Sequence, residues 1–305
     1  MAINTNKKNA VLGRLALILT TLIWGSSFVV LKNTIDTIPT LYVLAFRFSG
    51  AALLLLLIGH RELKKFDKST LIKGSILGVC LFAAYTVQTF GLALTTPGKN
   101  AFLTTTYCII VPFMLWFISH KRPNKFNVIA AVICLIGVGC VSLQNDFSVN
   151  LGDVLTLCCG FFYALHIILT GKFVKGHSVA LLNMVQFGVA ALLAWGFALL
   201  RDPLPSNITM GNIWSIAYLT VMCTAACYVL QTYGQKYTPP SSVAVIMTLE
   251  SVFGAIISVI FYNEILGPRL LIGFVLIFAA VLISETKLSF LKPKKPQAVP
   301  EPGQV

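Results

Sequence analysis

The chain has 305 residues, of which 57% are hydrophobic and only 11% are charged, and its formal net charge is +13. Its mean hydropathy of +0.84 is far from that of soluble proteins, in which about a quarter of the residues are charged. The composition therefore leaves no room for a soluble domain and predicts a multi-pass membrane protein.

The chain order predicts ten membrane-spanning helices separated by short polar turns. A bilayer core of about 30 Å needs about 20 apolar residues per helix, and segments of that size recur along the whole sequence. We place them at about 11–31, 38–58, 70–94, 98–118, 126–144, 151–171, 178–200, 209–235, 239–262 and 268–286. Turn residues such as Thr96-Pro97-Gly98, Asn145-Asp146, Pro239-Pro240 and Gly267-Pro268 mark the breaks.

The basic residues lie between these spans rather than on one amphipathic face, so we expect no nucleic-acid partner. If the N-terminus is cytoplasmic, 18 Lys and Arg residues fall on the inside, 4 fall on the outside, and Arg47 lies within the second span. The positive-inside rule then predicts that both termini are cytoplasmic. We expect the protein to lie in the plasma membrane. Residues 1–10 and 287–305 are expected to be the cytoplasmic tails.

The two halves of the chain, 11–145 and 150–286, resemble each other and predict an internal repeat. A shift of 139 aligns Leu12-Gly13 with Leu151-Gly152, and RFSGAALL from Arg47 with QFGVAALL from Gln186. A shift of 143 aligns, in one register, Tyr85 with Tyr228, Gln88 with Gln231, Gly91 with Gly234, Thr95 with Thr238, Pro97 with Pro240 and Thr105 with Thr248. Each half holds five helices, an odd number, so the second must enter the membrane from the opposite side. Inverted repeats of this kind are typical of secondary transporters that bind substrate near the bilayer midplane.

The same segments resemble the drug/metabolite transporter superfamily, in particular its EamA-like, ten-helix branch. The resemblance covers about residues 11 to 286 and is carried by WGSSFV from Trp24, TTPGKNAFLTTTYCIIVPF from Thr95, GDVLTLCCGFFYALHIILT from Gly152 and SSVAVIMTLESVFGAIISVIFYNE from Ser241. It implies an all-α fold of two inverted five-helix repeats and transport of a small metabolite. The chain departs from the family pattern at Lys121, where an acid like Glu264 commonly closes the fourth helix of a repeat, and at Tyr107, which aligns with Glu250.

Glu250 is the first candidate for the chemistry, because a lone carboxylate within a span costs several kcal/mol unless it faces a partner or a wet cavity. Its position favours a bound ammonium or guanidinium group that competes with a proton. A purely structural hydrogen bond between helices is the alternative. The other candidates for a shared central cavity are polar or aromatic residues within apolar spans: Trp24, Tyr85, Gln88, Thr104, Tyr107, Tyr163, His166, Tyr228 and Gln231.

Structural interpretations stay open for several of these residues. Gln88 and Gln231 could bond only to neighbouring helices, and His166 could be either a packing residue or a proton carrier. For Arg47, snorkelling or a structural pair is favoured over ligand contact. The eight cysteines lie within apolar segments without a metal-binding spacing, so we expect neither a metal nor a cofactor.

The sequence therefore predicts a secondary transporter of a small polar metabolite, with an amino acid, basic ones favoured, or an amine as the substrate. It would act by alternating access as an exporter or exchanger, with the lipid bilayer and coupled protons as partners, as a monomer or homodimer. An efflux carrier for drugs or toxic compounds is the alternative, and a channel or a membrane protein without transport is less favoured. The acids do not cluster as a membrane-embedded enzyme would need, so we expect no enzyme.

Overall fold

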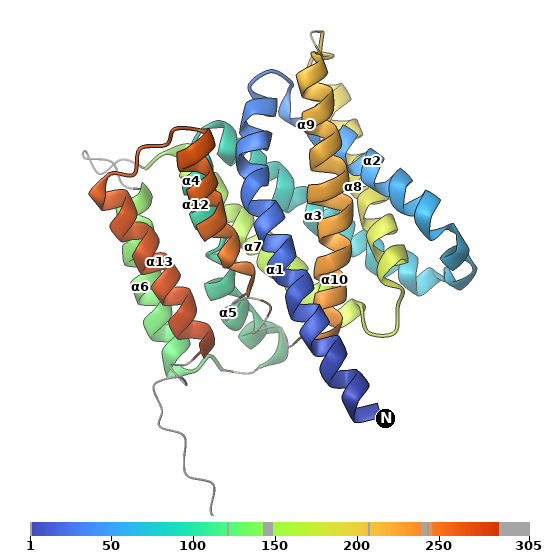
Figure 1. The fold of residues 1–305 in the computed structure, drawn as a ribbon, viewed down its shortest axis with the longest axis horizontal. Coiled ribbons are helices and arrows are strands. Elements are labelled where there is room, and N and C mark those ends of the chain that lie inside the picture. The colour runs from blue at the N-terminus through green and yellow to red at the C-terminus, as the bar shows by residue number, and fades with distance from the viewer. Residues whose placement is uncertain are drawn as a thin grey trace, which may run out of the picture.

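The structure is a computed structural model that describes residues 2–120, 122–142, 149–206, 208–238, 243 and 246–286. The predicted turn at Asn145-Asp146, the start of the ninth predicted span at Pro239, Lys121 and the tail at 287–305 lie outside these residues. The described chain is a bundle of roughly antiparallel helices (Figure 1). Its elements are α1 (Ala2–Ile35), α2 (Thr40–Gly59), the 3₁₀-helix η1 (His60–Lys65), α3 (Lys68–Ala93), α4 (Pro97–Thr104), α5 (Tyr107–Ser119), α6 (Lys125–Ser142), α7 (Leu151–Phe173), α8 (Val179–Arg201), α9 (Met210–Thr220), the π-helix η2 (Val221–Ala226), α10 (Cys227–Tyr237), α12 (Leu249–Phe261) and α13 (Pro268–Thr286).

These helices account for the predicted spans. Within the described residues, seven segments are long and apolar enough to cross a membrane, and Lys125–Val141, Leu249–Phe261 and Pro268–Ile283 are shorter apolar helices. The all-α, ten-span fold class is therefore confirmed. The first helix differs from its predicted start, because α1 begins at Ala2 and not near residue 11. No Gly or Pro precedes Gly13 to break the helix, so the helix runs on through the predicted tail.

Two of the predicted spans are broken at equivalent points. The fourth span is divided into α4 and α5 at Thr105-Thr106, where the hydroxyls of Thr105 and Thr106 donate to the carbonyls of Phe102 and Leu103 at 2.8 and 2.7 Å. Side-chain bonds of this kind compete with the helical ladder. In the ninth span, Thr248 is a turn and α12 begins at Leu249. Glu250 is therefore in the first turn of a helix and not, as predicted, in the middle of one continuous helix.

The packing of the helices follows the predicted two-fold relation between the repeats. Helix α1 packs on α10 and α12, and its counterpart α7 packs on α3, α4 and α5. Helices α2 and α8 pack on each other, as do α6 and α13, which are also related by the repeat. In Figure 1, α6 and α13 form a pair at one side of the bundle, next to α4, α5 and α12.

Aligned glycines allow two of these contacts. A Cβ on Gly91 would lie 2.9 Å from the carbonyl oxygen of Gly152, and one on Gly234 would lie 2.8 Å from that of Gly13. Small residues allow the backbones of membrane helices to approach closely. The two crossings use residues that the sequence repeat aligns, so the duplication also describes the packing.

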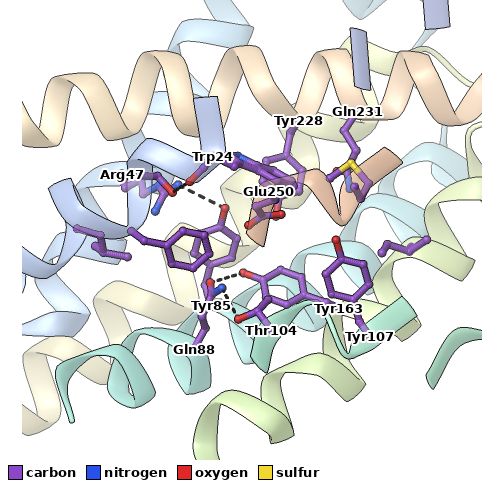
Figure 2. Close-up of a pocket in the computed structure, with 15 residues that line it drawn as sticks. Trp24, Arg47, Tyr85, Gln88, Thr104, Tyr107, Tyr163, Tyr228, Gln231 and Glu250 are labelled. Atoms are coloured by element: carbon purple, nitrogen blue, oxygen red, sulfur yellow. Dashed lines mark hydrogen bonds between the residues drawn. The ribbon is translucent and has the colours of Figure 1, made fainter. Parts of the chain in front are cut away.

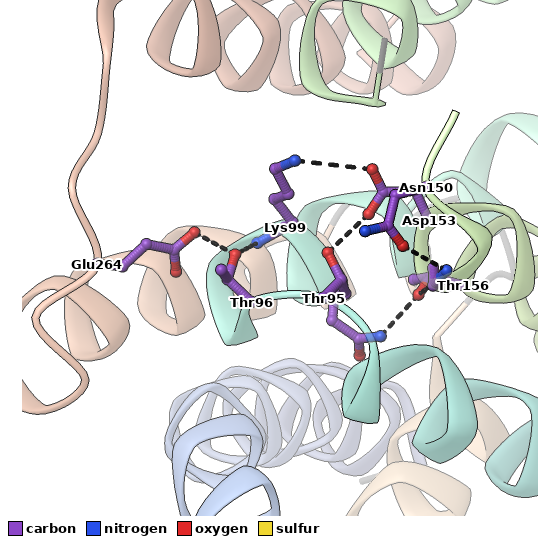
Figure 3. Close-up of polar contacts among 9 residues, drawn as sticks. Thr95, Thr96, Lys99, Asn150, Asp153, Thr156 and Glu264 are labelled. Carbon is purple, nitrogen blue, oxygen red and sulfur yellow. Dashed lines mark hydrogen bonds and ion pairs between the residues drawn. The ribbon is translucent and has the colours of Figure 1, made fainter. Parts of the chain in front are cut away.

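The bundle has two faces, named here by the chain ends. The proximal face holds the start of α1 and the end of α13, and the distal face holds the turns before α2, α4 and α13 (Figure 1). At the distal face, the carboxylate of Glu264 accepts from the Thr96 hydroxyl, from the Gly98 N–H at 2.9 Å and from the Ser258 hydroxyl at 2.5 Å. Nearby, the buried Asp153 accepts from the Thr95 hydroxyl at 2.7 Å and pairs with the Lys99 ammonium at 3.7 Å (Figure 3). These contacts join the α12–α13 turn and the start of α7 to the start of α4.

Candidate functional site

A small cavity lies where helices of both repeats meet, and Figure 2 shows its lining. Its volume is about 30 Å³, which is room for about two water molecules. A metabolite could enter only if the helices moved apart. The lining consists of Trp24, Ser27, Phe28, Leu31, Arg47, Tyr85, Gln88, Thr104, Tyr107, Tyr163, Ile167, Tyr228, Gln231, Met247 and Glu250.

Nine of the ten predicted site residues line this cavity, and His166 does not. Its ring nitrogen Nε2 lies 2.9 Å from Oε1 of Gln186 on α8, and its ring packs edge-on against Tyr228 at 5.8 Å. This hydrogen bond holds the His166 side chain toward α8, and its ring contacts Tyr228, which lines the cavity. The structure therefore does not bring His166 into the lining with the other nine residues, and its role in the site stays a prediction.

The sequence-based prediction missed several lining residues that helical spacing could have identified. Ser27, Phe28 and Leu31 follow Trp24 at spacings of three, four and seven, which places them on one face of α1. Ile167 follows Tyr163 by four residues on α7, and Met247 precedes Glu250 by three. The apolar character of most of these residues explains why a search for polar groups passed over them.

Two aromatic pairs in the lining are related by the repeat. The rings of Trp24 and Tyr228 are 5.1 Å apart, and those of their counterparts Tyr163 and Tyr85 are 5.8 Å apart. The Tyr163 hydroxyl donates to Oε1 of Gln88 at 2.6 Å, and the Gln88 amide donates to the Thr104 hydroxyl at 3.1 Å. Gln88 is thus held by α4 and α7 together, on one wall of the cavity.

Other polar groups of the lining have no partner in the described part of the chain. The Tyr107 hydroxyl and Oε1 of Gln231 are buried without a hydrogen bond. Glu250 is 6% exposed, and neither a hydrogen bond nor an ion pair joins its carboxylate to another described residue. Buried polar groups without partners are costly in a membrane. Three such groups stand around this one cavity.

The fold gives Glu250 and Tyr107 matching positions. The shift of 143 aligns them, and each stands in the first turn of a half-helix, Tyr107 in α5 and Glu250 in α12. The N-terminus of a helix carries a partial positive charge that favours a carboxylate in its first turn. Broken helices that meet at the midplane are typical of binding sites in inverted-repeat transporters.

Arg47 also lines the cavity, although the sequence favoured a structural role for it. The side chain is buried with 1% exposure, and its Nε donates to the Thr224 hydroxyl of η2. Its Nη2 lies 3.3 Å from the Tyr85 hydroxyl and 3.4 Å from the Cys223 carbonyl oxygen. The guanidinium carbon lies 4.7 Å from the centre of the Tyr85 ring. All these acceptors are neutral, so no carboxylate within the described chain neutralises Arg47.

The described residues contain no group of three or more His, Cys, Asp or Glu side chains that could hold a metal ion. The chemical groups of the site are those of the cavity lining. One cation, one carboxylate, several hydroxyls and two amides stand among aromatic rings there. Such a lining can bind and orient a small polar solute.

Comparison with known proteins identifies the sequence family. The model of the EamA-like transporter family matches residues 11–143 and again 150–286. An uncharacterized transporter of Archaeoglobus fulgidus is 31% identical over 269 residues, which cover 88% of this chain and 84% of the relative. Protein PecM of Dickeya dadantii is 22% identical over 277 residues, covering 90% of this chain and 92% of the relative.

A solved crystal structure has the same fold. It superposes with a TM-score of 0.69 at 14% sequence identity and covers 92% of this chain and 99% of the other. The two family matches and the ten-span bundle agree with the resemblance noted in the sequence. The chain belongs to the EamA-like transporter family of the drug/metabolite transporter superfamily.

Proposed function

We propose that this transporter carries a small metabolite with a cationic group, an amino acid or an amine, by alternating access through the central cavity. Glu250 carries the proposal, because its carboxylate lines the cavity without a partner among the described residues. Basic substrates are favoured over acidic ones for the same reason. The protein acts as an exporter or exchanger in the plasma membrane, as a monomer or homodimer.

The small cavity supports a carrier over a channel. A volume of about 30 Å³ is too small for a metabolite to pass, whereas an open pore needs a continuous path of that width. Helices of both repeats surround the cavity, so movement of one repeat against the other would open it to one face at a time. Saturation and counterflow are the signs of such a carrier, and an open pore shows neither.

Proton coupling follows from the same carboxylate. Burial among apolar side chains disfavours the charged form of a carboxyl group, whereas a bound cation favours it. A proton and a cationic substrate therefore compete for Glu250. Release of the proton to one face and of the substrate to the other would couple their movements.

The orientation rests on the charge count. The 18 to 4 distribution of Lys and Arg supports a cytoplasmic position for the proximal face. A cysteine introduced at Asp67, which precedes α3 at this face, should stay unlabelled when intact cells are treated with an impermeant thiol reagent. Labelling from outside would reverse the orientation.

Glu250→Gln tests the proposed function, because it keeps the shape of the side chain and fixes the neutral form. In proteoliposomes, counterflow of L-lysine, L-leucine and their decarboxylated amines should fall by about tenfold or more, since a charged hydrogen bond is lost. The pH dependence of transport should flatten. Glu62→Gln is the matched control, because Glu62 accepts a hydrogen bond from Ser178 away from the cavity. Normal expression with unchanged affinity and pH dependence in Glu250→Gln would return Glu250 to a structural role.

A further inference from the structure

We propose that Arg47 and Glu250 bind the two ends of one zwitterionic substrate, with an α-carboxylate at Arg47 and an ammonium group at Glu250. This inference rests on the proposed function and narrows its substrate class from amines in general to amino acids. Figure 2 shows Arg47 on α2 at one side of the lining, Glu250 near the centre, and Gln231 and Tyr107 toward the other side. One cavity thus presents a cation and an anion to the same solute.

The guanidinium of Arg47 keeps donors for a ligand. Its hydrogen bonds to described residues start from Nε and Nη2, and none starts from Nη1. Arginine has five N–H donors in a planar fork that matches a carboxylate. Since Arg47 lines the cavity, a substrate carboxylate is the group that would complete its donor set.

The π-helix η2 holds the Arg47 side chain in position through two hydrogen-bond acceptors. The Thr224 hydroxyl donates to the Leu219 carbonyl, five residues earlier, at 2.8 Å, so its oxygen is turned to accept from Nε of Arg47. The Cys223 carbonyl accepts from both Arg47 and the indole N–H of Trp24. The aligned part of the first repeat, in α3, is a regular α-helix. Short π-helical turns often mark functional sites, and this one fixes Arg47 with neutral acceptors that leave its charge available.

The rest of the lining offers oxygen atoms that can accept hydrogen bonds. The Glu250 carboxylate, Oε1 of Gln231 and the Tyr107 hydroxyl have no partner among the described residues. An ammonium group has three donors and no acceptor. Three oxygen acceptors in one lining, one of them charged, match that group.

The charges favour a zwitterion over a simple amine. The salt bridges within the described residues join Lys32 to Asp36 and Lys99 to Asp153, and none joins Arg47 to Glu250. An unpaired buried charge costs several kcal/mol. A simple amine would pair Glu250 and leave Arg47 unpaired, whereas an amino acid pairs both charges and adds no net charge to the cavity.

Matched probe sets test the inference on the unmodified protein. Counterflow in proteoliposomes is measured for L-leucine, L-lysine and L-phenylalanine, each beside its decarboxylated amine and its deaminated acid. For the amino acid with the greatest counterflow, we expect the amine and the acid to be transported at least about tenfold less efficiently. Equal transport of the amine would overturn the zwitterion and leave the proposed cation carrier intact. Absence of counterflow for every probe would overturn the proposed function as well.

Arg47→Gln then assigns the carboxylate end. The ratio of amino acid to amine transport should fall from about tenfold to about one, while in Glu250→Gln the ratio of amino acid to acid transport should fall. Arg47→Lys keeps the charge but not the fork, so it should give an intermediate ratio. Monodispersity and Tm in detergent show whether each variant folds. If Arg47→Gln does not fold, the probe sets on the wild type decide the inference. An unchanged ratio in folded Arg47→Gln would make Arg47 only a tether between α2 and η2.

Discussion

The two ends of the cavity are built from aligned residues of the two repeats, yet their polar groups are satisfied differently. Toward the distal face, Gln88 is held by Tyr163 and Thr104, Leu92 is apolar, and Thr95 bonds to Asp153. Toward the proximal face, the counterparts Gln231, Gln235 and Thr238 carry buried oxygen or nitrogen atoms without a hydrogen bond in the described chain. The aligned helices α3 and α10 therefore differ. The polar groups toward the distal face have partners, whereas those toward the proximal face have none among the described residues.

The carboxylate of Glu264 adds to this difference. It joins the α12–α13 turn to the first turn of α4 through Thr96 and Gly98. The aligned position in the first repeat is Lys121, which cannot accept a hydrogen bond. The repeat places similar helices at both ends, whereas a few substitutions decide how many buried polar groups there have partners. We therefore expect the distal end to be the harder one to open.

Glu264→Ala should give the largest change in this comparison. It leaves the donors of Thr96, Gly98 and Ser258 without their acceptor, which costs about 2 kcal/mol, or roughly a thirtyfold shift, toward a state open at the distal face. In a background without native cysteines, a cysteine at the cavity residue Leu31 should then react faster with an impermeant thiol reagent. Glu62→Ala, which removes a carboxylate at the proximal face, should leave that rate unchanged. An equal rate in Glu264→Ala would mean that helix packing alone closes the distal end.

Exchange of residue types between the aligned positions Leu92 and Gln235 should change the stability of the protein by a smaller amount, with opposite sign at the two ends. Gln235→Leu copies Leu92 of the first repeat and removes a buried amide without partners, so it should stabilise the protein by about 1 kcal/mol. Leu92→Gln places an amide in an apolar site with 0% exposure and should destabilise by a similar or larger amount. Tm in detergent measures both. If Gln235 lines a hydrated path in another conformation, the stabilised Gln235→Leu variant should also transport more slowly, and a lower Tm for it would contradict the asymmetry.

The sequence predicted the fold class and most of the cavity lining because the membrane requires long apolar segments, against which polar residues stand out in the sequence. Apolar length revealed the spans, and recurrence of Tyr85, Gln88, Gly91 and Thr95 at one shift revealed the repeat. The position of Arg47 was not visible, because its contacts come from η2, far away in the chain, and a π-helical turn has no clear sequence signal. His166 was expected in the cavity lining, because residue spacing cannot show that its ring forms a hydrogen bond with Gln186 on α8.

The smallest effect concerns the helix caps at the two faces. At the proximal face, Oδ1 of Asp67 caps α3 by accepting from the Thr70 N–H at 2.8 Å and from the Thr70 hydroxyl at 2.5 Å. The hydrogen bond from the Thr70 side chain is the main cause that lowers the pKa of Asp67 below its usual value. At the distal face, α9 is capped by reciprocal hydrogen bonds between Thr209 and Asn212, and neither side chain titrates in this range.

A carboxylate whose pKa is lowered by folding stabilises the folded form above the unfolded pKa, about 4, and that contribution is lost as the pH falls through the lower folded value. Acid should therefore loosen the first turn of α3 and leave that of α9 unchanged. Amide hydrogen exchange of the two turns, compared between pH 6 and pH 3 after correction for intrinsic rates, measures this. In Asp67→Asn, which retains a good cap without a titrating group, the pH dependence of the α3 turn should disappear. Equal loosening of both turns in the wild type would show that acid acts on the bundle as a whole rather than on its proximal cap.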